Sequence, residues 1–173
     1  MSTFFEDGIV GHVGFADPVC PLMGTALADA ADRANGSGKV HRGGTLVCIE
    51  GPQFSSRAES RVYRSWGVSV IGMTAMPEAK LAREAELPYA ALALSTDYDC
   101  WHESEDDVSV EAVVAMVKKN VSVARRTIGE LAKALPDPQK SPATGAIANA
   151  VMTHPEGVTP EARARLSWLI DKR

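Results

Sequence analysis

The chain has 173 residues, of which 45% are hydrophobic and 23% charged, in the range of ordinary globular proteins. This length suits one domain, residues 1–173, that can bury a core of its own. The formal net charge of −4 argues against nucleic-acid and anionic-membrane partners. With no apolar run near the roughly 18 residues of a membrane span and no leader-like start, we expect a cytoplasmic protein that binds a small molecule.

Three cysteines, Cys20, Cys48 and Cys100, form no Cys-x-x-Cys pair. An odd number without paired spacing argues against a disulfide framework and a structural zinc site, and fits a reducing compartment. The four histidines are scattered, so we expect no metal site.

The first two thirds of the chain alternate between apolar runs and helical patterns. A short strand is predicted at residues 8–15, and a helix begins at Pro21 and ends at Asn35-Gly36-Ser37-Gly38. Strands are then predicted at residues 44–50, 68–73 and 89–94, with helices at 57–66 and 77–86 between them. Ser56 and Glu59 have the spacing of a capping box. This alternation predicts an α/β fold with a mixed, mostly parallel sheet flanked by helices, and with binding groups at the carboxyl ends of the strands.

The last third is mainly helical. Apolar residues in steps of three and four predict one buried face on a long helix that Ser109 can cap and Pro136 ends. That face comprises Val110, Val113, Val114, Val117, Val121, Ala124, Ile128, Leu131 and Leu135. A connector follows at 137–145, and a last helix is predicted over Pro160–Ile170.

Two strand ends carry candidate binding groups. After the first, Gly51-Pro52-Gln53 is a turn, Phe54 offers a stacking face, and a helix begins close to Ser55. After the second, Gly72 permits close approach, Met73 is a soft apolar surface, and Thr74 can donate a hydrogen bond to phosphate or sugar. The alternative is that both are ordinary turns before capped helices.

Asp97 and Asp99 end the third apolar run, where two unpartnered carboxylates would be costly. If both face one pocket, repulsion and burial should raise one pKa, leaving a protonated acid beside an ionised one. Adenine presents a matching edge, because ring N7 accepts a hydrogen bond and the exocyclic amino group donates one. The alternative is a solvated acidic loop, because the acidity continues in Glu103, Glu105, Asp106 and Asp107.

Three segments together, Gly44–Ser60, Ile71-Gly72-Met73-Thr74 and Ser95-Thr96-Asp97-Tyr98-Asp99-Cys100-Trp101, resemble the S-methyl-5′-thioadenosine phosphorylases of the trimeric purine nucleoside phosphorylase family. The resemblance implies a pentosyltransferase of purine and methionine salvage, a homotrimer that uses inorganic phosphate as co-substrate and needs no cofactor. It implies that Phe54 and Met73 bracket base and ribose, that Thr74 contacts phosphate, and that Asp97 and Asp99 read adenine, with Asp97 donating a proton to N7. Val110, Val113 and Val114 would shape the pocket for the methylthio group.

Ser55 separates the sequence from the 6-oxopurine branch, which has glutamate there and asparagine in place of Asp97. The resemblance covers only the C-terminal portion of a family member, because the N-terminal strand, the glycine-rich phosphate loop and an Arg-His pair have no counterpart. We therefore expect a truncated domain that lacks the first strands and has impaired activity. A 6-oxopurine nucleoside phosphorylase and a non-catalytic nucleoside-binding remnant are the alternatives.

Overall fold

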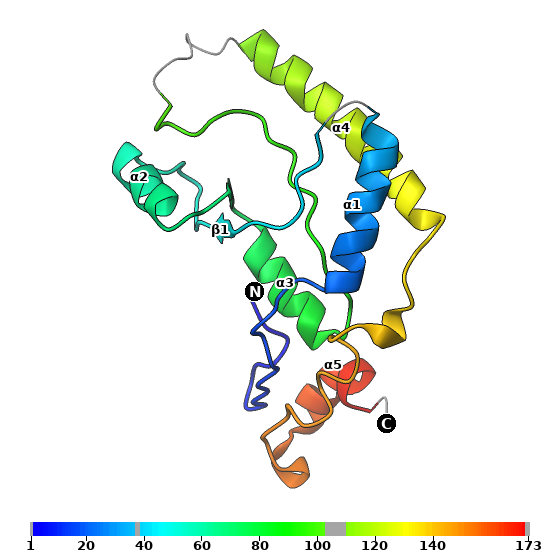
Figure 1. Cartoon of the computed structure of the whole chain (residues 1–173). Helices are drawn as coiled ribbons and strands as arrows, with labels where there is room; N and C mark the ends of the chain where they lie inside the picture. The colour runs from blue at the N-terminus through cyan, green and yellow to red at the C-terminus, as the bar shows by residue number, and fades with distance from the viewer. Residues whose placement is uncertain (1, 37–38, 103–109, 172–173) are drawn as a thin grey trace. The chain divides into compact units, whose positions relative to one another are not determined.

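The computed structural model describes residues 2–36, 39–102 and 110–171, and gives only the backbone of residues 110–113. Its α-helices are α1 (Pro21–Asn35), α2 (Arg57–Ser65), α3 (Ala75–Glu84), α4 (Val110–Ala132) and α5 (Pro160–Ile170) (Figure 1). The strands are β1 (Leu46–Cys48) and β2 (Val70–Gly72), and two 3₁₀ helices, η1 (Pro138–Lys140) and η2 (Pro155–Gly157), follow α4. The prediction of an α/β fold is confirmed.

The helix predictions are confirmed with small shifts in their ends. Helix α1 begins at Pro21, α5 has its predicted bounds, and α3 begins two residues before Pro77 and ends at Glu84. The capping box of α2 forms as predicted: the Ser56 hydroxyl accepts from the Glu59 backbone N–H, and the Glu59 carboxylate accepts from the Ser56 N–H at 2.7 Å. Gly67 follows the helix with φ +78°, a left-handed conformation that glycine adopts without strain.

Contacts within the described chain divide it into two compact units. Unit 1 comprises Met1–Gly24, Met76–Ala90 and Pro136–Arg173, and unit 2 comprises Thr25–Ala75 and Ala91–Leu135. Each unit is described by itself below. The expectation of one truncated domain over residues 1–173 stays a prediction.

Unit 1 has its own hydrophobic core, formed between the N-terminal segment and α5. Its buried members are Phe5, Ile9, Ile147, Ala162, Leu166 and Leu169. The segment predicted as a strand at 8–15 forms only one antiparallel bridge, Gly11 to Val151, so that prediction is wrong in extent. A ladder needs backbone pairing along its length, and here the paired region is limited to hydrogen bonds such as His12 N–H to the Ala150 carbonyl, 2.8 Å.

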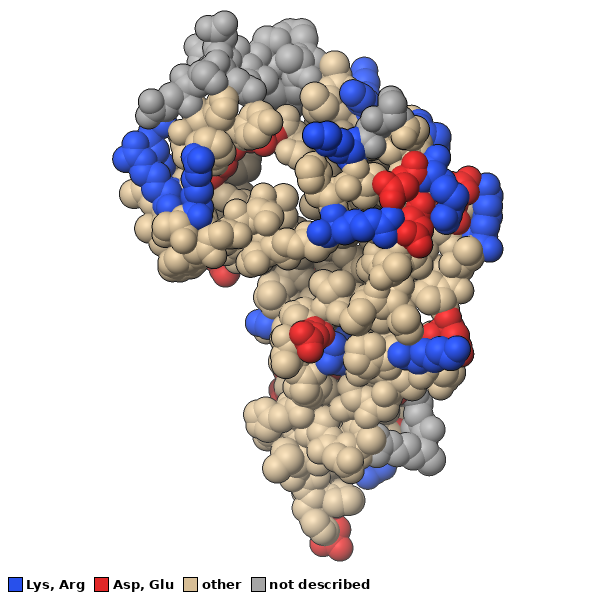
Figure 2. All heavy atoms as spheres, in the orientation of Figure 1, with Lys and Arg blue, Asp and Glu red and all other residues tan. Residues whose placement is uncertain are grey.

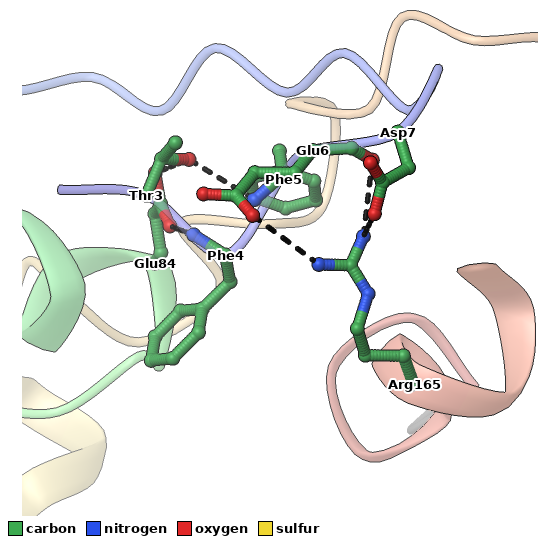
Figure 3. Close-up of polar contacts among 7 residues, drawn as sticks. All are labelled: Thr3, Phe4, Phe5, Glu6, Asp7, Glu84 and Arg165. Atoms are coloured by element: carbon green, nitrogen blue, oxygen red, sulfur yellow. Dashed lines mark hydrogen bonds and ion pairs between the residues drawn. The ribbon is translucent and has the colours of Figure 1, made fainter. Parts of the chain in front are cut away.

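Glu84 anchors the N-terminal segment of unit 1 (Figure 3). Its carboxylate is buried, and it accepts hydrogen bonds from the Thr3 hydroxyl at 2.7 Å and from the Phe4 N–H at 2.6 Å. Arg165 of α5 lies on the other side of the segment, with ion-pair distances of 3.7 Å to Glu6 and 3.3 Å to Asp7. The two hydrogen bonds compensate the Glu84 carboxylate for its burial. Without Glu84, the Thr3 hydroxyl and the Phe4 N–H would lose their acceptor.

Glu84→Ala should therefore destabilise unit 1 by about 1–3 kcal/mol, the usual cost of leaving buried polar partners unsatisfied. Urea unfolding followed by circular dichroism measures the change. Glu156→Ala is the matched control, because the Glu156 side chain is 92% exposed. Equal unfolding midpoints for the two variants would show that the Glu84 contacts contribute nothing net.

Unit 2 contains the only strand pairing among the described residues. Strands β1 and β2 are parallel, with Leu46 opposite Val70, Val47 opposite Ile71 and Cys48 opposite Gly72. The strands predicted at 44–50 and 68–73 are confirmed in shortened form. The strand predicted at 89–94 is wrong, since no ladder is formed there. Exposure alternates along residues 91–94, as in an extended chain, but an extended chain becomes a strand only when a neighbour bonds to it.

The predicted buried face of α4 is also wrong over most of its length. The described members of that face are largely exposed, with exposed fractions from 43% for Val117 and Val121 to 62% for Leu135. Two members of the predicted face, Ala124 and Leu131, are half-buried, and they share the packed side with half-buried Asn120 and buried Thr127, which the prediction did not include. These four residues follow steps of four and three, so they lie on one side of α4. Helix α4 contacts α1 where Arg126 Nε donates to the Ala34 carbonyl at 3.2 Å.

Candidate active site

The turns after β1 and β2 lie together at the carboxyl end of the sheet in unit 2. The Ile49 N–H donates to the Gly72 carbonyl at 2.8 Å, so the two strands leave the sheet side by side. Gly51 has φ +69°, and a Cβ there would lie 3.0 Å from the Met73 sulfur. Glycine thus allows the first turn, predicted at Gly51-Pro52-Gln53, to lie against Met73.

The first turn leads directly into α2 and presents an aromatic ring. Phe54 is 88% exposed, which leaves its face free to stack on a ligand, while Ser55 is half-buried next to the helix N-terminus. Thr74 is exposed directly after Met73. These four residues, predicted as site residues, come from neighbouring strand ends.

We call residues 95–101 the aspartate loop. Its Cys100 thiol lies 3.6 Å from the Ser55 carbonyl, so the loop reaches the turn before α2. The Asp97 carboxylate is exposed and accepts a hydrogen bond from the Thr96 hydroxyl at 2.7 Å. One Asp99 oxygen accepts from the Cys100 N–H at 2.8 Å. The structure thus brings the loop with both predicted aspartates to the turn that carries Phe54 and Ser55.

Two polar atoms near this contact are buried and lack a partner among the described residues: the Ser55 hydroxyl oxygen and the second Asp99 carboxylate oxygen, Oδ2. Buried polar atoms are nearly always hydrogen-bonded, because an unsatisfied one loses its solvation without compensation. A hydroxyl and a carboxylate oxygen left in this state are ready to bind a polar ligand that offers a donor.

The three valines predicted to form the apolar pocket, Val110, Val113 and Val114, are only partly described by the structure. The Val110 and Val113 side chains lie outside the described residues, and Val114 is 45% exposed. An open hollow along α4 is lined by Val117, Lys118, Val121, Ser122, Arg125 and Arg126, none of them a predicted site residue. Val114, whose side chain is the one described among the three predicted valines, does not line this hollow.

Sequence reasoning missed three residues that contact the aspartate loop. Arg57 and Arg64 of α2 contact Cys100 and Trp101, and Asn120 of α4 contacts Ser95. The arginines are seven residues apart and share one helical face, a signal visible in the sequence. Asn120 interrupts the apolar pattern of α4, and only the structure shows what it binds.

The helix N-terminus at the site has one perturbed carboxyl group. Hydrogen bonds from the Ser56 hydroxyl and backbone N–H lower the pKa of Glu59 below its usual value of 4.5. Because the pKa of Glu59 is lower in the folded than in the unfolded state, its ionised carboxylate stabilises the fold at pH values above its unfolded-state pKa. This stabilisation is lost as the pH falls through the folded-state pKa of Glu59.

We therefore expect Glu59→Gln to remove part of the acid sensitivity of unfolding, and to do so only in the window at and below about pH 4.5. Thermal unfolding of wild type and variant from pH 3 to pH 7 measures this. Parallel pH profiles, offset by a constant amount, would contradict the role of Glu59 ionisation in the cap.

The described residues contain no group of three His, Cys, Asp or Glu side chains placed to hold a metal ion. Their three cysteines are unpaired. None of the described helices has the length and apolar character needed to cross a membrane.

The parallel strands β1 and β2 end in turns that carry an aromatic ring and hydroxyl groups, and the aspartate loop reaches the first of these turns. Polar and aromatic groups at the carboxyl ends of parallel strands are typical of α/β sites for small ligands. The sequence model of the phosphorylase superfamily matches residues 2–135. The chain therefore belongs to the phosphorylase superfamily, and its fold is a partial nucleoside phosphorylase fold.

Its relatives include S-methyl-5′-thioadenosine phosphorylases. The chain is 50% identical over 169 residues to the protein of Geobacter sulfurreducens, which covers 98% of this chain and 58% of the relative. It is 52% identical over 174 residues to that of Thermosynechococcus vestitus, covering 99% and 60%. The chain thus spans about 60% of the length of these curated relatives.

Solved structures that resemble this chain are also methylthioadenosine phosphorylases. A methylthioadenosine phosphorylase sourced from an antarctic soil metagenomic library superposes with a TM-score of 0.89 at 46% identity, covering 98% of this chain and 60% of that one. The Schistosoma mansoni methylthioadenosine phosphorylase in complex with adenine gives a TM-score of 0.73 at 28% identity, covering 88% and 61%.

Proposed function

We propose that this chain carries the base-binding part of an S-methyl-5′-thioadenosine phosphorylase, which converts methylthioadenosine and phosphate to adenine and 5-methylthioribose 1-phosphate. The observation that supports it most is the pair of buried atoms without partners, the Ser55 hydroxyl and Asp99 Oδ2, on the turn and the aspartate loop. The names of the relatives point to the same substrate.

Recognition of the base would use hydrogen bonds that only an adenine edge can complete. Asp99 would accept from the exocyclic amino group, and a protonated Asp97 would donate to N7. Guanine and hypoxanthine carry a carbonyl oxygen where the amino group would be, and this oxygen would face the Asp99 carboxylate. Phe54 and Met73 would contact the base and ribose, with Ser55 leaving room at the adenine edge.

The reaction forms a bond between a phosphate oxygen and C1′ of the ribose and breaks the bond from C1′ to N9. The electron pair of the broken bond goes to the purine, and the proton of Asp97 goes to N7, which makes adenine a better leaving group. Thr74 would contact the phosphate. Inorganic phosphate is the co-substrate, and the proposal requires no cofactor and no metal.

The isolated chain should be weakly active or inactive unless another chain supplies the missing groups. Positioning and charge neutralisation of the nucleophile each supply several kcal/mol of barrier reduction, and Thr74 alone would provide only one phosphate contact. Val110, Val113 and Val114 would contact the methylthio group. The proposal also includes that the protein assembles as a homotrimer and acts in the cytoplasm.

The test compares methylthioadenosine with inosine as ligands of the purified chain. Calorimetry with and without phosphate measures binding, and chromatography of long incubations measures released base. Binding of methylthioadenosine in preference to inosine, with slow phosphate-dependent adenine release, is the expected result. Preference for inosine would overturn the adenine assignment, and adenine release at the rates of complete relatives would overturn the impairment.

A further inference from the structure

Two arginines of α2 fasten the end of the aspartate loop. Arg57 Nη1 donates to the Cys100 carbonyl at 2.5 Å. The Arg64 guanidinium carbon lies 3.7 Å from the centroid of the Trp101 ring, well within cation–π range. One backbone contact and one side-chain contact, from the same helix, therefore hold consecutive loop residues.

The arginines belong to an exposed basic face of α2. Arg57, Arg61 and Arg64 follow the steps of four and three that place side chains on one side of a helix. Figure 2 shows basic side chains gathered over α2. Among the described residues, Arg61 forms no hydrogen bond, ion pair or cation–π contact with the aspartate loop. Arg61 therefore serves as a comparison for Arg57 and Arg64, because it lies on the same face of the same helix without their contacts to the loop.

Trp101 also contacts Tyr98, the residue between Asp97 and Asp99. The ring of Tyr98 lies 6.3 Å from that of Trp101, edge to face, and stacks on His102 at 4.8 Å. Movement of Trp101 would therefore displace Tyr98, and with it both neighbouring aspartates. The start of the loop is held separately, because Asn120 Nδ2 of α4 donates to the Ser95 carbonyl at 3.0 Å.

We call the contacts of Arg57 with Cys100 and of Arg64 with Trp101 the clamp, and they bear on the position of Asp99 relative to Ser55. Helix α2 begins two residues after Ser55, so a loop tied to α2 is also tied to the turn before it. The unpartnered Ser55 hydroxyl and Asp99 Oδ2 are therefore carried by two segments that are joined by the contacts of Arg57 and Arg64 and by the Cys100 thiol, 3.6 Å from the Ser55 carbonyl.

We propose that Arg64, assisted by Arg57, is a positioning residue for adenine recognition: its stacking on Trp101 holds the aspartate loop, which carries Asp97 and Asp99, against α2 and the turn before it. This inference rests on the proposed function, because it concerns the groups assigned to adenine. Neither arginine is proposed to touch the substrate.

The test uses the whole chain with Trp66→Phe and Trp168→Phe, so that Trp101 is the remaining tryptophan of the three. In this background, Arg64→Met should change the Trp101 emission and weaken adenine binding in calorimetry by about two- to fivefold, as expected for the loss of one exposed cation–π contact. Arg64→Lys keeps the charge but not the planar group, and should restore only part of both.

Arg61→Met is the matched control and should leave emission and affinity unchanged. A double-mutant cycle of Arg64→Met with Trp101→Phe should show coupling in adenine affinity, which a general loss of stability would not produce. If adenine binds and Arg64→Met alters neither emission nor affinity, the positioning role is wrong. If Arg64→Met changes the emission but the parent chain binds no adenine, the clamp exists while the proposed function, and the positioning role with it, fails.

Discussion

Asp97→Asn should slow adenine release by about 10²–10⁴-fold while leaving adenine binding nearly unchanged. Asparagine has almost the shape of aspartate, and its amide can donate a hydrogen bond to N7, but it cannot transfer a proton to the leaving base. An effect confined to the chemical step is the signature of a general acid. Long incubations with methylthioadenosine and phosphate, followed by chromatography, give the ratio of rates, and calorimetry with adenine gives the affinity.

Asp99→Asn is the informative comparison, because it should act mainly on binding. Its amide would place a donor or a weaker acceptor against the exocyclic amino group, so adenine affinity should fall and discrimination against hypoxanthine should narrow. Glu156→Gln, at an exposed position in unit 1, should change neither quantity. If Asp97→Asn weakens binding and rate by the same factor, Asp97 is a binding residue and not the proton donor.

Leu166→Ala should lower the free energy of unfolding by about 2–5 kcal/mol. Leu166 is 1% exposed and is the largest fully buried side chain among the described residues, in the core that joins the N-terminal segment to α5. Removing most of its side chain forfeits its transfer free energy and leaves a cavity that the surrounding side chains fill only partly. Urea unfolding monitored by circular dichroism measures the loss.

Leu135→Ala provides the same chemical change at a position that is 62% exposed. Its effect should stay within about 0.5 kcal/mol, since a substitution outside the core creates no cavity. A Leu166→Ala variant no less stable than Leu135→Ala would show that the core cluster of unit 1 does not contribute to the stability of the chain.

Local sequence signals predicted most of the helices. Pro21 begins α1, Ser56 and Glu59 form the predicted capping box of α2, and Pro160–Ile170 forms α5. Such ends depend on side chains within a few residues of the cap, so a short window contains the physics that decides them. The candidate site residues could be listed from the sequence in the same way, because the turns after the strands at 44–50 and 68–73 and the aspartates at 97 and 99 can be read in order, and their roles stay a prediction.

The failures concern partners distant in the chain. The run at 89–94 has the pattern of a strand and no ladder, and most described members of the predicted face of α4 remain exposed while Thr127 is buried. A periodic pattern shows that a segment can be a strand or can bury a face. Whether it does so depends on which other segment lies against it, and that is a property of the tertiary structure.

The sequence by itself determined the α/β class, the helix caps and the residue types at the strand ends, because each depends on neighbours along the chain. Only the tertiary structure decided that the Ser55 hydroxyl and Asp99 Oδ2 would be buried without partners among the described residues, and that Arg57 and Arg64 would contact the aspartate loop. These contacts join residues about 40 positions apart, and burial and hydrogen bonding between such residues follow from packing in three dimensions.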